Sequence, residues 1–129
     1  MLEGSCHCGA VSWRMDNDPT DATACNCTLC RRYGVLWSYG HADEDMHVVG
    51  ETKAYTRGRE IGFHFCPTCG CIICWIGLNP GPDGRRRAAV NIRLAEPDRV
   101  AHLPIDHFEG LVAFKDLPRD GRTVADYWF

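Results

Sequence analysis

Short runs of alternating apolar and polar residues dominate the chain, and helical periodicity is nearly absent. Val11, Trp13 and Met15 alternate with polar residues, which is the two-residue period of a half-buried strand. The runs that predict strands are Ala10–Met15, Val35–Tyr39, Lys53–Thr56, Ile61–Phe65, Ile72–Leu78 and Ala88–Leu94. Turn sequences rich in Gly, Pro, Asp and Asn separate several of them. Many short strands with glycine-rich turns predict a mainly β fold.

The remaining segments predict little regular structure. Only Thr28–Tyr33 predicts a helical turn, and it is too short to form a packing helix by itself. His102–Phe108 and Leu111–Phe114 are expected to be edge strands, because prolines in this region exclude long regular elements. The chain ends in Tyr127-Trp128-Phe129, an aromatic cluster that we expect to pack against the sheet.

Length and composition predict one domain over residues 1–129. The chain is 45% apolar but contains 13 glycines and 7 prolines, so its core is expected to be modest and much of the chain to form turns. Such a core is expected to need additional stabilisation, for example by a metal.

Charge and hydropathy exclude two classes of partner. The net charge of −3 and the pI near 6.0 provide no basic field for nucleic acid. The one basic run, Arg85-Arg86-Arg87, follows a Gly-Pro-Asp-Gly turn and is expected to be a solvated loop. No apolar run reaches the roughly 18–20 residues of a membrane helix. The N-terminal residues lack a basic-then-apolar signal sequence, so we expect a cytoplasmic protein.

Nine cysteines in a chain of this length are the outlying feature. In a reducing compartment, closely spaced cysteines favour a metal site over disulfides. They form three groups, Cys6-His-Cys8, Cys25-Asn-Cys27-Thr-Leu-Cys30 and Cys66-Pro-Thr-Cys69-Gly-Cys71-Ile-Ile-Cys74. The spacing Cys66-Pro-Thr-Cys69-Gly is that of a zinc knuckle, a tight turn in which two thiolates converge on one ion.

A closed tetrahedral site needs two further ligands, and the cysteine spacing allows two partitions. If Cys6 and Cys8 join Cys66 and Cys69, the middle group of Cys25, Cys27 and Cys30 forms a second, three-ligand site. Three protein ligands with a vacant fourth position are typical of a catalytic zinc. In the alternative partition, a pair from the middle group completes the closed site and leaves Cys6 and Cys8 free.

Cys71 and Cys74 are expected to be small core residues. They stand at or beside the apolar run Ile72–Leu78 and differ by three positions, so in a strand their side chains point to opposite faces. His7 is expected to point away from its cysteine neighbours for the same reason.

Three sequence blocks carry a family resemblance. They are Gly4-Ser5-Cys6-His7-Cys8-Gly9-Ala10-Val11, Cys25-Asn26-Cys27-Thr28-Leu29-Cys30-Arg31-Arg32, and Phe65-Cys66-Pro67-Thr68-Cys69-Gly70 followed by Trp75. In this order, with Pro104 to His107 as a C-terminal block, they resemble the glutathione-dependent formaldehyde-activating enzyme family. The resemblance implies a tent-like β fold held by a structural zinc on Cys6, Cys8, Cys66 and Cys69. It implies a labile, active-site zinc on Cys25, Cys27 and Cys30.

The resemblance also implies a reaction, the joining of glutathione to formaldehyde, which is a carbon–sulfur lyase reaction run in reverse. No catalytic residue beyond the metal ligands is predicted, because water can supply the proton that the product needs. Arg31 and Arg32, with the pair Arg57 and Arg59 as an alternative, are candidates for binding the two carboxylates of glutathione. The competing hypothesis is a non-catalytic, zinc-stapled module that binds or senses thiols.

Overall fold

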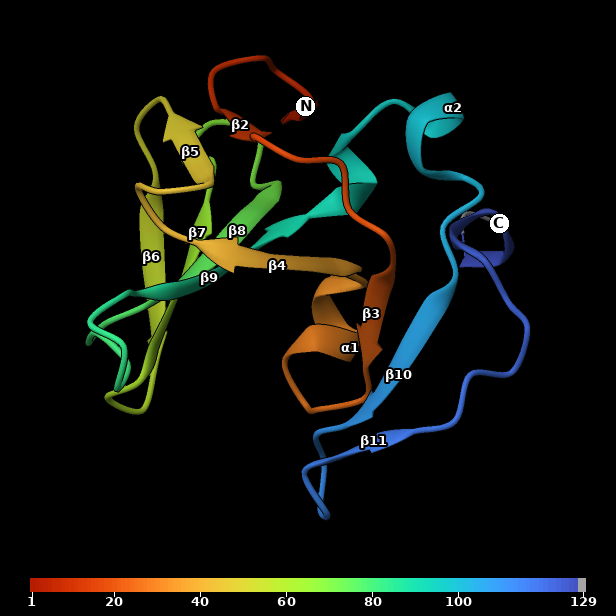
Figure 1. The fold of residues 1–129 in the computed structure, drawn as a ribbon. Helices are drawn as coiled ribbons and strands as arrows, with labels where there is room; N and C mark the ends of the chain where they lie inside the picture. The colour runs from red at the N-terminus through yellow and green to blue at the C-terminus, as the bar shows by residue number, and fades with distance from the viewer. Residues whose placement is uncertain (128–129) are drawn as a thin grey trace.

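The computed structural model describes residues 1–127, and most of its regular structure is strand (Figure 1). The strands are β1 (Leu2–Ser5), β2 (Ser12–Met15), β3 (Ala22–Cys25), β4 (Trp37–His41), β5 (Met46–Val49), β6 (Lys53–Arg57), β7 (Ile61–Phe65), β8 (Ile72–Gly77), β9 (Arg87–Asn91), β10 (Ile105–Glu109) and β11 (Lys115–Leu117). The helical segments are α1 (Cys30–Tyr33), α2 (Pro97–Val100), and the 3-10 turns η1 (Ile92–Leu94) and η2 (Val124–Tyr127). The predicted mainly β fold is confirmed.

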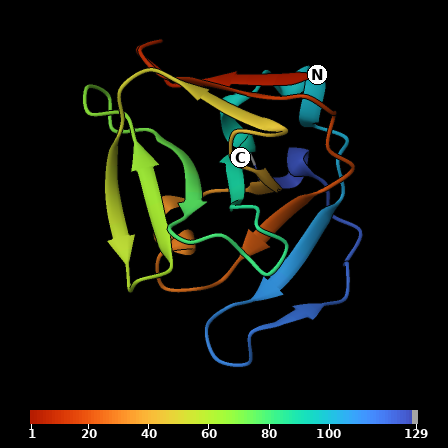
Figure 2. The same ribbon diagram turned by 60° about the vertical axis from the view of Figure 1, so that its left-hand side comes forward.

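The strands form two sheets. A three-stranded sheet has the order β1-β2-β5, and an eight-stranded sheet has the order β11-β10-β3-β4-β9-β8-β7-β6. Neighbouring strands are antiparallel except β3 and β10, which pair in parallel although about eighty residues separate them in sequence. The β10–β11 hairpin projects from the rest of the molecule in both ribbon views (Figures 1 and 2). This arrangement places the loop after β10 beside the end of β3.

The buried apolar residues form two clusters. The larger lies between the two sheets and includes Trp13, Met46 and Ile73. The smaller gathers residues of the middle cysteine group with Trp37 and Phe63. The middle cysteines therefore sit on an apolar base of their own, apart from the main core.

Most of the strands predicted from periodicity are confirmed, with ends that shift by one or two residues. The prediction for Ala88–Leu94 is wrong at its C-terminal end, where η1 replaces the strand after Asn91. The Asn91 side chain accepts a hydrogen bond from the backbone N–H of Arg93, which caps the 3-10 turn. The helical turn expected in Thr28–Tyr33 is present as α1, and it ends at Gly34, whose φ is 66°.

The C-terminal expectations need correction. Leu111–Phe114 is a turn rather than a strand, and the edge strand is β11, which follows it. The carboxylate of Glu109 accepts hydrogen bonds from the backbone N–H groups of Leu111, Val112 and Ala113, which fixes a turn. The strand expected within His102–Phe108 is β10, and it lies between β3 and β11 instead of at an edge.

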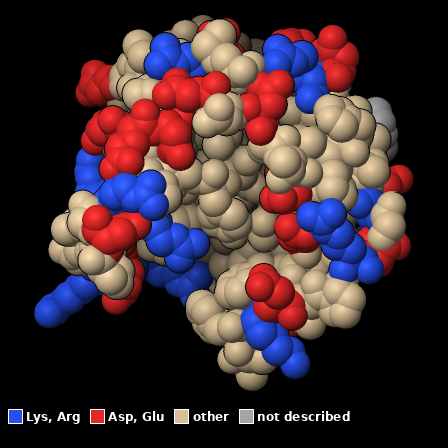
Figure 3. Space-filling view, viewed as in Figure 1, with Lys and Arg blue, Asp and Glu red and all other residues tan. Residues whose placement is uncertain are grey.

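The expected terminal aromatic cluster falls partly outside the described residues, which end before Trp128 and Phe129. Tyr127 packs against the larger apolar cluster. In residues 1–127, no helix has the length and apolar character that a membrane crossing requires. On the face drawn in Figure 3, Lys and Arg are interspersed with Asp and Glu around a hollow of uncharged residues. That face therefore lacks a continuous basic surface.

Candidate metal centres and the adjoining cavity

Two similar tight turns present the first set of sulfur atoms. In the first, the N–H of Gly9 donates to the carbonyl of Cys6 at 3.1 Å, and in the second the N–H of Gly70 donates to the carbonyl of Cys66 at 2.9 Å. Both glycines are left-handed, with φ values of 80° and 79°, a conformation that is costly for residues with a Cβ. Each Cys-x-Cys-Gly or Cys-x-x-Cys-Gly segment is thus folded back so that the sulfur atoms of its two cysteines face the same point.

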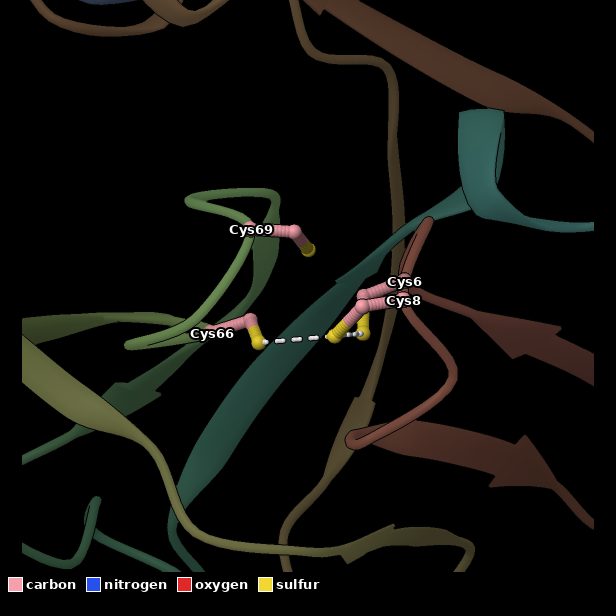
Figure 4. A group of neighbouring side chains, drawn as sticks. All are labelled: Cys6, Cys8, Cys66 and Cys69. Carbon is pink, nitrogen blue, oxygen red and sulfur yellow. Dashed lines mark hydrogen bonds between the residues drawn. The ribbon is translucent and has the colours of Figure 1, made fainter.

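Cys6, Cys8, Cys66 and Cys69 come together in one cluster, here called the knuckle site (Figure 4). Their Sγ atoms all lie within 4.8 Å of one another. The Cys6–Cys8 and Cys8–Cys66 sulfur distances are 3.7 and 3.6 Å. A tetrahedral zinc with Zn–S bonds of about 2.3 Å requires sulfur atoms about 3.8 Å apart. The donor set therefore fits a zinc ion, and Cys6 and Cys8 are brought to Cys66 and Cys69 as in the first of the two partitions.

Backbone amides favour the thiolate form of two of these cysteines, Cys66 and Cys69, whereas desolvation and hydrogen bonds to the neighbouring sulfur atoms raise the pKa of Cys8 to about 11. The N–H of Val11 donates to Cys6 Sγ at 3.3 Å. Hydrogen bonds from the backbone N–H groups of Cys71 and Cys8 lower the pKa of Cys69 to about 5. Hydrogen bonds from the backbone of Cys69 and Thr68 also lower the pKa of Cys66. Since metals bind the thiolate, these turns are prepared to hold a cation.

The two remaining cysteines of the third sequence group lie outside the four-sulfur cluster. Cys74 is fully buried in β8 within the larger apolar cluster, and burial raises the pKa of its thiol to about 12. Cys71, which precedes β8, is only half-buried. Burial and the neighbouring Cys69 side chain raise the pKa of the Cys71 thiol. The side chain of His7 is exposed. Cys74 is thus a core residue, whereas Cys71 borders the knuckle site.

The second set, Cys25, Cys27 and Cys30, is here called the three-cysteine site. Cys25 ends β3 and Cys30 begins α1, so the turn between these elements folds the three sulfur atoms to within 4.8 Å of one another. Cys27 and Cys30 are 4% and 6% exposed, and Cys25 is half-buried. These distances and this chemistry fit a metal ion held by three thiolates.

Every sulfur of the three-cysteine site accepts at least one N–H hydrogen bond. Backbone amides donate to Cys25 Sγ at 3.5 Å and to Cys27 Sγ at 3.2 Å. The indole Nε1 of Trp37 donates to Cys30 Sγ at 3.3 Å, and Nη1 of Arg57 donates to Cys27 Sγ at 3.4 Å. A hydrogen bond from the Cys30 thiol, with further help from the Cys27 backbone and the Arg57 charge, lowers the pKa of Cys25 to about 6. The same hydrogen bond, together with burial, raises the pKa of Cys30. The arrangement therefore favours negative charge at Cys25.

The loop after β10 closes one side of the three-cysteine site. Asn26 lies between two of the cysteines, and its side chain donates to Glu109 at 3.2 Å and accepts from the N–H of Gly110 at 2.9 Å. Gly110 packs so closely that a Cβ on it would lie 2.7 Å from Cys25 Sγ and 3.3 Å from Cys27 Cβ. The β10–β11 hairpin is thus fastened directly to the cysteine turn.

We expect Gly110→Ala to weaken metal binding at the three-cysteine site by about 10–100-fold, the effect typical of disturbing groups that position ligands. The added methyl group must displace Cys25 or the loop. Overpacking of this kind destabilises a fold by only about 1–3 kcal/mol, so we expect the variant to remain folded. Competition titration with a zinc chelator measures the affinity. Gly81→Ala is the matched control, because its Cβ would meet no atom closer than 3.5 Å. Equal zinc affinity in the two variants would contradict the assigned contact.

A cavity of about 460 Å³ opens next to the three-cysteine site. It is lined by Cys25, Cys27, Cys30, Trp37, Tyr39, Arg57, Ile61, Phe63, Trp75, Arg87, Phe108, Gly110, Phe114 and Asp116. Six of these fourteen residues are aromatic, so we call it the aromatic cavity. A volume of this size admits a small organic molecule.

Two arginines contribute positive charge to the aromatic cavity. Arg57 contacts Cys27 as described, and the Arg87 guanidinium lies over the ring of Tyr39 at 5.9 Å. Among the described residues, neither guanidinium is within ion-pair distance of a carboxylate. The lining contains one carboxylate, Asp116, against these two cations, so the cavity can receive an anionic group beside the arginines.

The two arginines predicted to bind substrate lie outside the cavity lining. Arg31 and Arg32 are both exposed on α1, and Nη1 of Arg32 donates to the carbonyl of Thr28 at 2.7 Å. Arg32 lines a separate, shallower hollow that it shares with Arg57. The sequence did not mark Arg87 as a site residue, because it is the last residue of a basic run that was expected to be a solvated loop. Arg85 and Arg86 pair with acidic residues in the expected loop, but Arg87 begins β9.

The fold and the sites define a class of protein, mainly β, with two cysteine clusters that can each hold a metal ion. Tight turns form the first cluster, and the second lies beside a cavity. More narrowly, the chain belongs to the glutathione-dependent formaldehyde-activating enzyme family, whose model matches residues 1–101.

Two individual proteins resemble the chain. A protein of Halomonas elongata named "Putative glutathione-dependent formaldehyde-activating enzyme" is 28% identical over 141 residues, covering 98% of this chain and 88% of its own length. A crystal structure of a Rhodobacter sphaeroides protein has a TM-score of 0.62 at 27% identity, covering 81% of this chain and 99% of that one. The family resemblance noted from the cysteine blocks is confirmed.

Proposed function

We propose that this protein joins glutathione to formaldehyde, forming S-(hydroxymethyl)glutathione, and so acts as a carbon–sulfur lyase in the reverse direction. The proposal assigns a structural zinc to the knuckle site and a more labile, active-site zinc to the three-cysteine site. The observation that supports it most directly is that the three-cysteine site borders a cavity large enough for a small thiol. Family membership supports the two substrates.

A bound zinc with three protein thiolates and a free position would lower the pKa of a thiol beside it and keep that thiol ionised near neutral pH. Cys25, Cys27 and Cys30 would hold the ion, and no fourth cysteine, histidine or carboxylate joins them among the described residues. A thiol with a pKa of about 8.5 is only about 3% ionised at pH 7. Ionisation is therefore the contribution that the reaction most needs.

Hydrogen bonds from the chain would direct the reaction to the incoming sulfur. Trp37 Nε1, Arg57 Nη1 and two backbone amides donate to the protein sulfur atoms, which draws charge from these thiolates and makes them weaker nucleophiles. The sulfur of glutathione receives none of these four bonds. Arg57 and Arg87 stand where carboxylates of glutathione can pair with them.

The chemical step itself is short. The glutathione sulfur adds to the carbonyl carbon, the carbon–sulfur bond forms, and the π electrons of the carbonyl move to oxygen, which takes a proton from water. We name no general acid. Arg31 and Arg32 stay predicted substrate contacts, which would act from α1, outside the cavity lining. We also propose a cytoplasmic location, where the nine cysteines, all free in this structure, stay reduced.

The second candidate is a thiol-binding or thiol-sensing module without turnover. The observation in its favour is the burial of the three-cysteine site, where two of the three sulfur-bearing residues are 4% and 6% exposed. Access restricted in this way suits slow exchange of a bound thiol better than rapid turnover. The two candidates differ in whether formaldehyde is consumed faster with protein than without it.

The test is ¹³C-NMR of labelled formaldehyde with glutathione at pH 6, with elemental analysis of zinc before and after glutathione is added. We expect two zinc ions per chain and faster adduct formation than in the protein-free reaction. The relative acceleration should be larger at pH 6 than at pH 8, because only about 0.3% of a thiol with a pKa of about 8.5 is ionised at pH 6. Two zinc ions with no acceleration at either pH would favour the sensing module.

A further inference from the structure

The aromatic part of the cavity wall has no counterpart in the substrates of the proposed reaction. Three pairs of aromatic residues line the cavity. The ring centroids are 6.2 Å apart in Trp37–Phe63, 6.0 Å in Tyr39–Trp75 and 5.8 Å in Phe108–Phe114. Formaldehyde has no side chain, and glutathione is a polar, doubly carboxylated peptide. Neither substrate supplies apolar surface to cover these rings.

Phe114, which lines the cavity, and its sequence neighbours carry further exposed apolar surface. Phe114 is 67% exposed, and its neighbours Leu111 and Val112 are 51% and 82% exposed. Phe114 also has a left-handed φ of 51°, which is uncommon for an aromatic residue and clusters at ligand-binding sites. Its ring meets Phe108 edge-on, at an interplanar angle of 81°. An exposed ring held in this way is suited to covering an apolar ligand.

The β10–β11 hairpin contributes two rings and no arginine to the cavity lining. Arg57 is the last residue of β6 and Arg87 is the first residue of β9. Phe108, Gly110 and Phe114 come from the β10–β11 hairpin. Gly110 places this hairpin against Cys25. Because Phe108 pairs in register with Cys25, a substituent on a sulfur atom held at the cysteines has the hairpin rings beside it, while the arginines remain available for carboxylates.

We infer that the carbonyl substrate of this site is an aryl aldehyde, whose ring occupies the space between the buried pair Trp37–Phe63 and the hairpin pair Phe108–Phe114. The inference rests on the proposed use of glutathione, which takes the arginines and leaves the rings for the carbonyl compound. The thiolate adds to the aldehyde carbon, the carbonyl π pair moves to oxygen, and water supplies the proton. No oxidant or reductant is required.

Two stable thioethers test this inference without turnover. S-benzylglutathione has the shape of the aryl aldehyde adduct, and S-methylglutathione has the shape of the formaldehyde adduct. We expect isothermal titration of the zinc-loaded protein to show S-benzylglutathione binding about ten-fold or more tightly, because it buries a phenyl ring against aromatic partners. Equal affinities, tighter binding of the methyl compound, or no binding of either would overturn the inference.

A variant of Phe114 tests where the phenyl ring of S-benzylglutathione binds. Phe114→Asn removes the aromatic group, and asparagine tolerates the left-handed backbone. We expect the ratio of the two affinities to fall about three-fold or more. Tyr55→Asn is the matched control, since Tyr55 is an exposed aromatic residue, 54% accessible, that lines only the neighbouring hollow. An unchanged ratio in Phe114→Asn, or an equal fall in Tyr55→Asn, would contradict the placement.

The outcomes separate this inference from the proposed function. Tight S-benzylglutathione binding without accelerated formaldehyde consumption would support the aryl site and reject formaldehyde as the substrate. Accelerated formaldehyde consumption with equal binding of the two thioethers would retain the proposed function and reject the aryl aldehyde.

Discussion

Cys69→Ser is expected to unfold most of the protein at 25 °C, whereas Cys71→Ser is expected to leave it folded. Structural zinc binding contributes roughly 10–16 kcal/mol in small zinc domains, and a whole domain is stable by only about 5–15 kcal/mol. Cys69 belongs to the knuckle site, which joins the N-terminal turn to the turn before β8. Loss of one thiolate removes most of the metal affinity and with it this connection.

Cys71 is a matched control because it stands two residues away, borders the same site and is not one of its four sulfur ligands. Far-ultraviolet circular dichroism, thermal melting and zinc analysis on both variants provide the measurement. Cys69→Ser with the parent spectrum and one tightly held zinc would show that the fold does not depend on this site. A zinc ion lost from Cys71→Ser would show that the ligand set is wrongly divided.

Cys30→Ser is expected to keep the fold and one zinc while losing the second zinc and any acceleration of adduct formation. Serine is a weak ligand, and a site with three thiolates has none to spare. Since disturbing an outer-shell group alone costs about 10–100-fold in metal affinity, removal of a ligand should cost more than about 100-fold. Glutathione would then return to its solution pKa and react at the protein-free rate.

The measurements are zinc content after gel filtration and adduct formation followed by ¹³C-NMR, with Cys71→Ser again as the control. The smaller apolar cluster should survive, because serine nearly matches cysteine in size and Trp37 and Phe63 remain packed. If Cys30→Ser retains two zinc ions, another group completes the site. If it loses one zinc and still accelerates the reaction, the chemistry takes place elsewhere.

Local sequence pattern was enough to predict the parts of the fold that depend on neighbouring residues. Alternation identified strands such as β2 and β7, and the spacing around Cys66 identified a turn that converges two sulfur atoms. Short strands with weak alternation, such as β1 and β5, escaped notice because they are defined by their partners in the three-stranded sheet. β-propensity is a context-dependent signal of this kind.

The candidate ligands followed from the sequence, but the surroundings of the second site did not. The spacing of Cys25, Cys27 and Cys30 limits them to one small region whatever the fold. The cavity beside them depends on long-range pairing, in particular the parallel pairing of β3 with β10 that brings Phe108 next to Cys25. Arg87 and Phe114 carry no motif that marks them, and only the folded sheet places both in the lining of the cavity that the three cysteines share.

The fastening of Gly110 to the three-cysteine site sets an order of assembly during synthesis. The knuckle site has all its ligands once residue 69 has been made, whereas the three-cysteine site lacks its covering loop until residue 110 follows. At about 5–20 residues per second, those roughly 40 residues take about 2–8 s. The middle cysteines, all made by residue 30, therefore stay uncovered until the β10–β11 hairpin arrives, after the knuckle site has gained its last ligand.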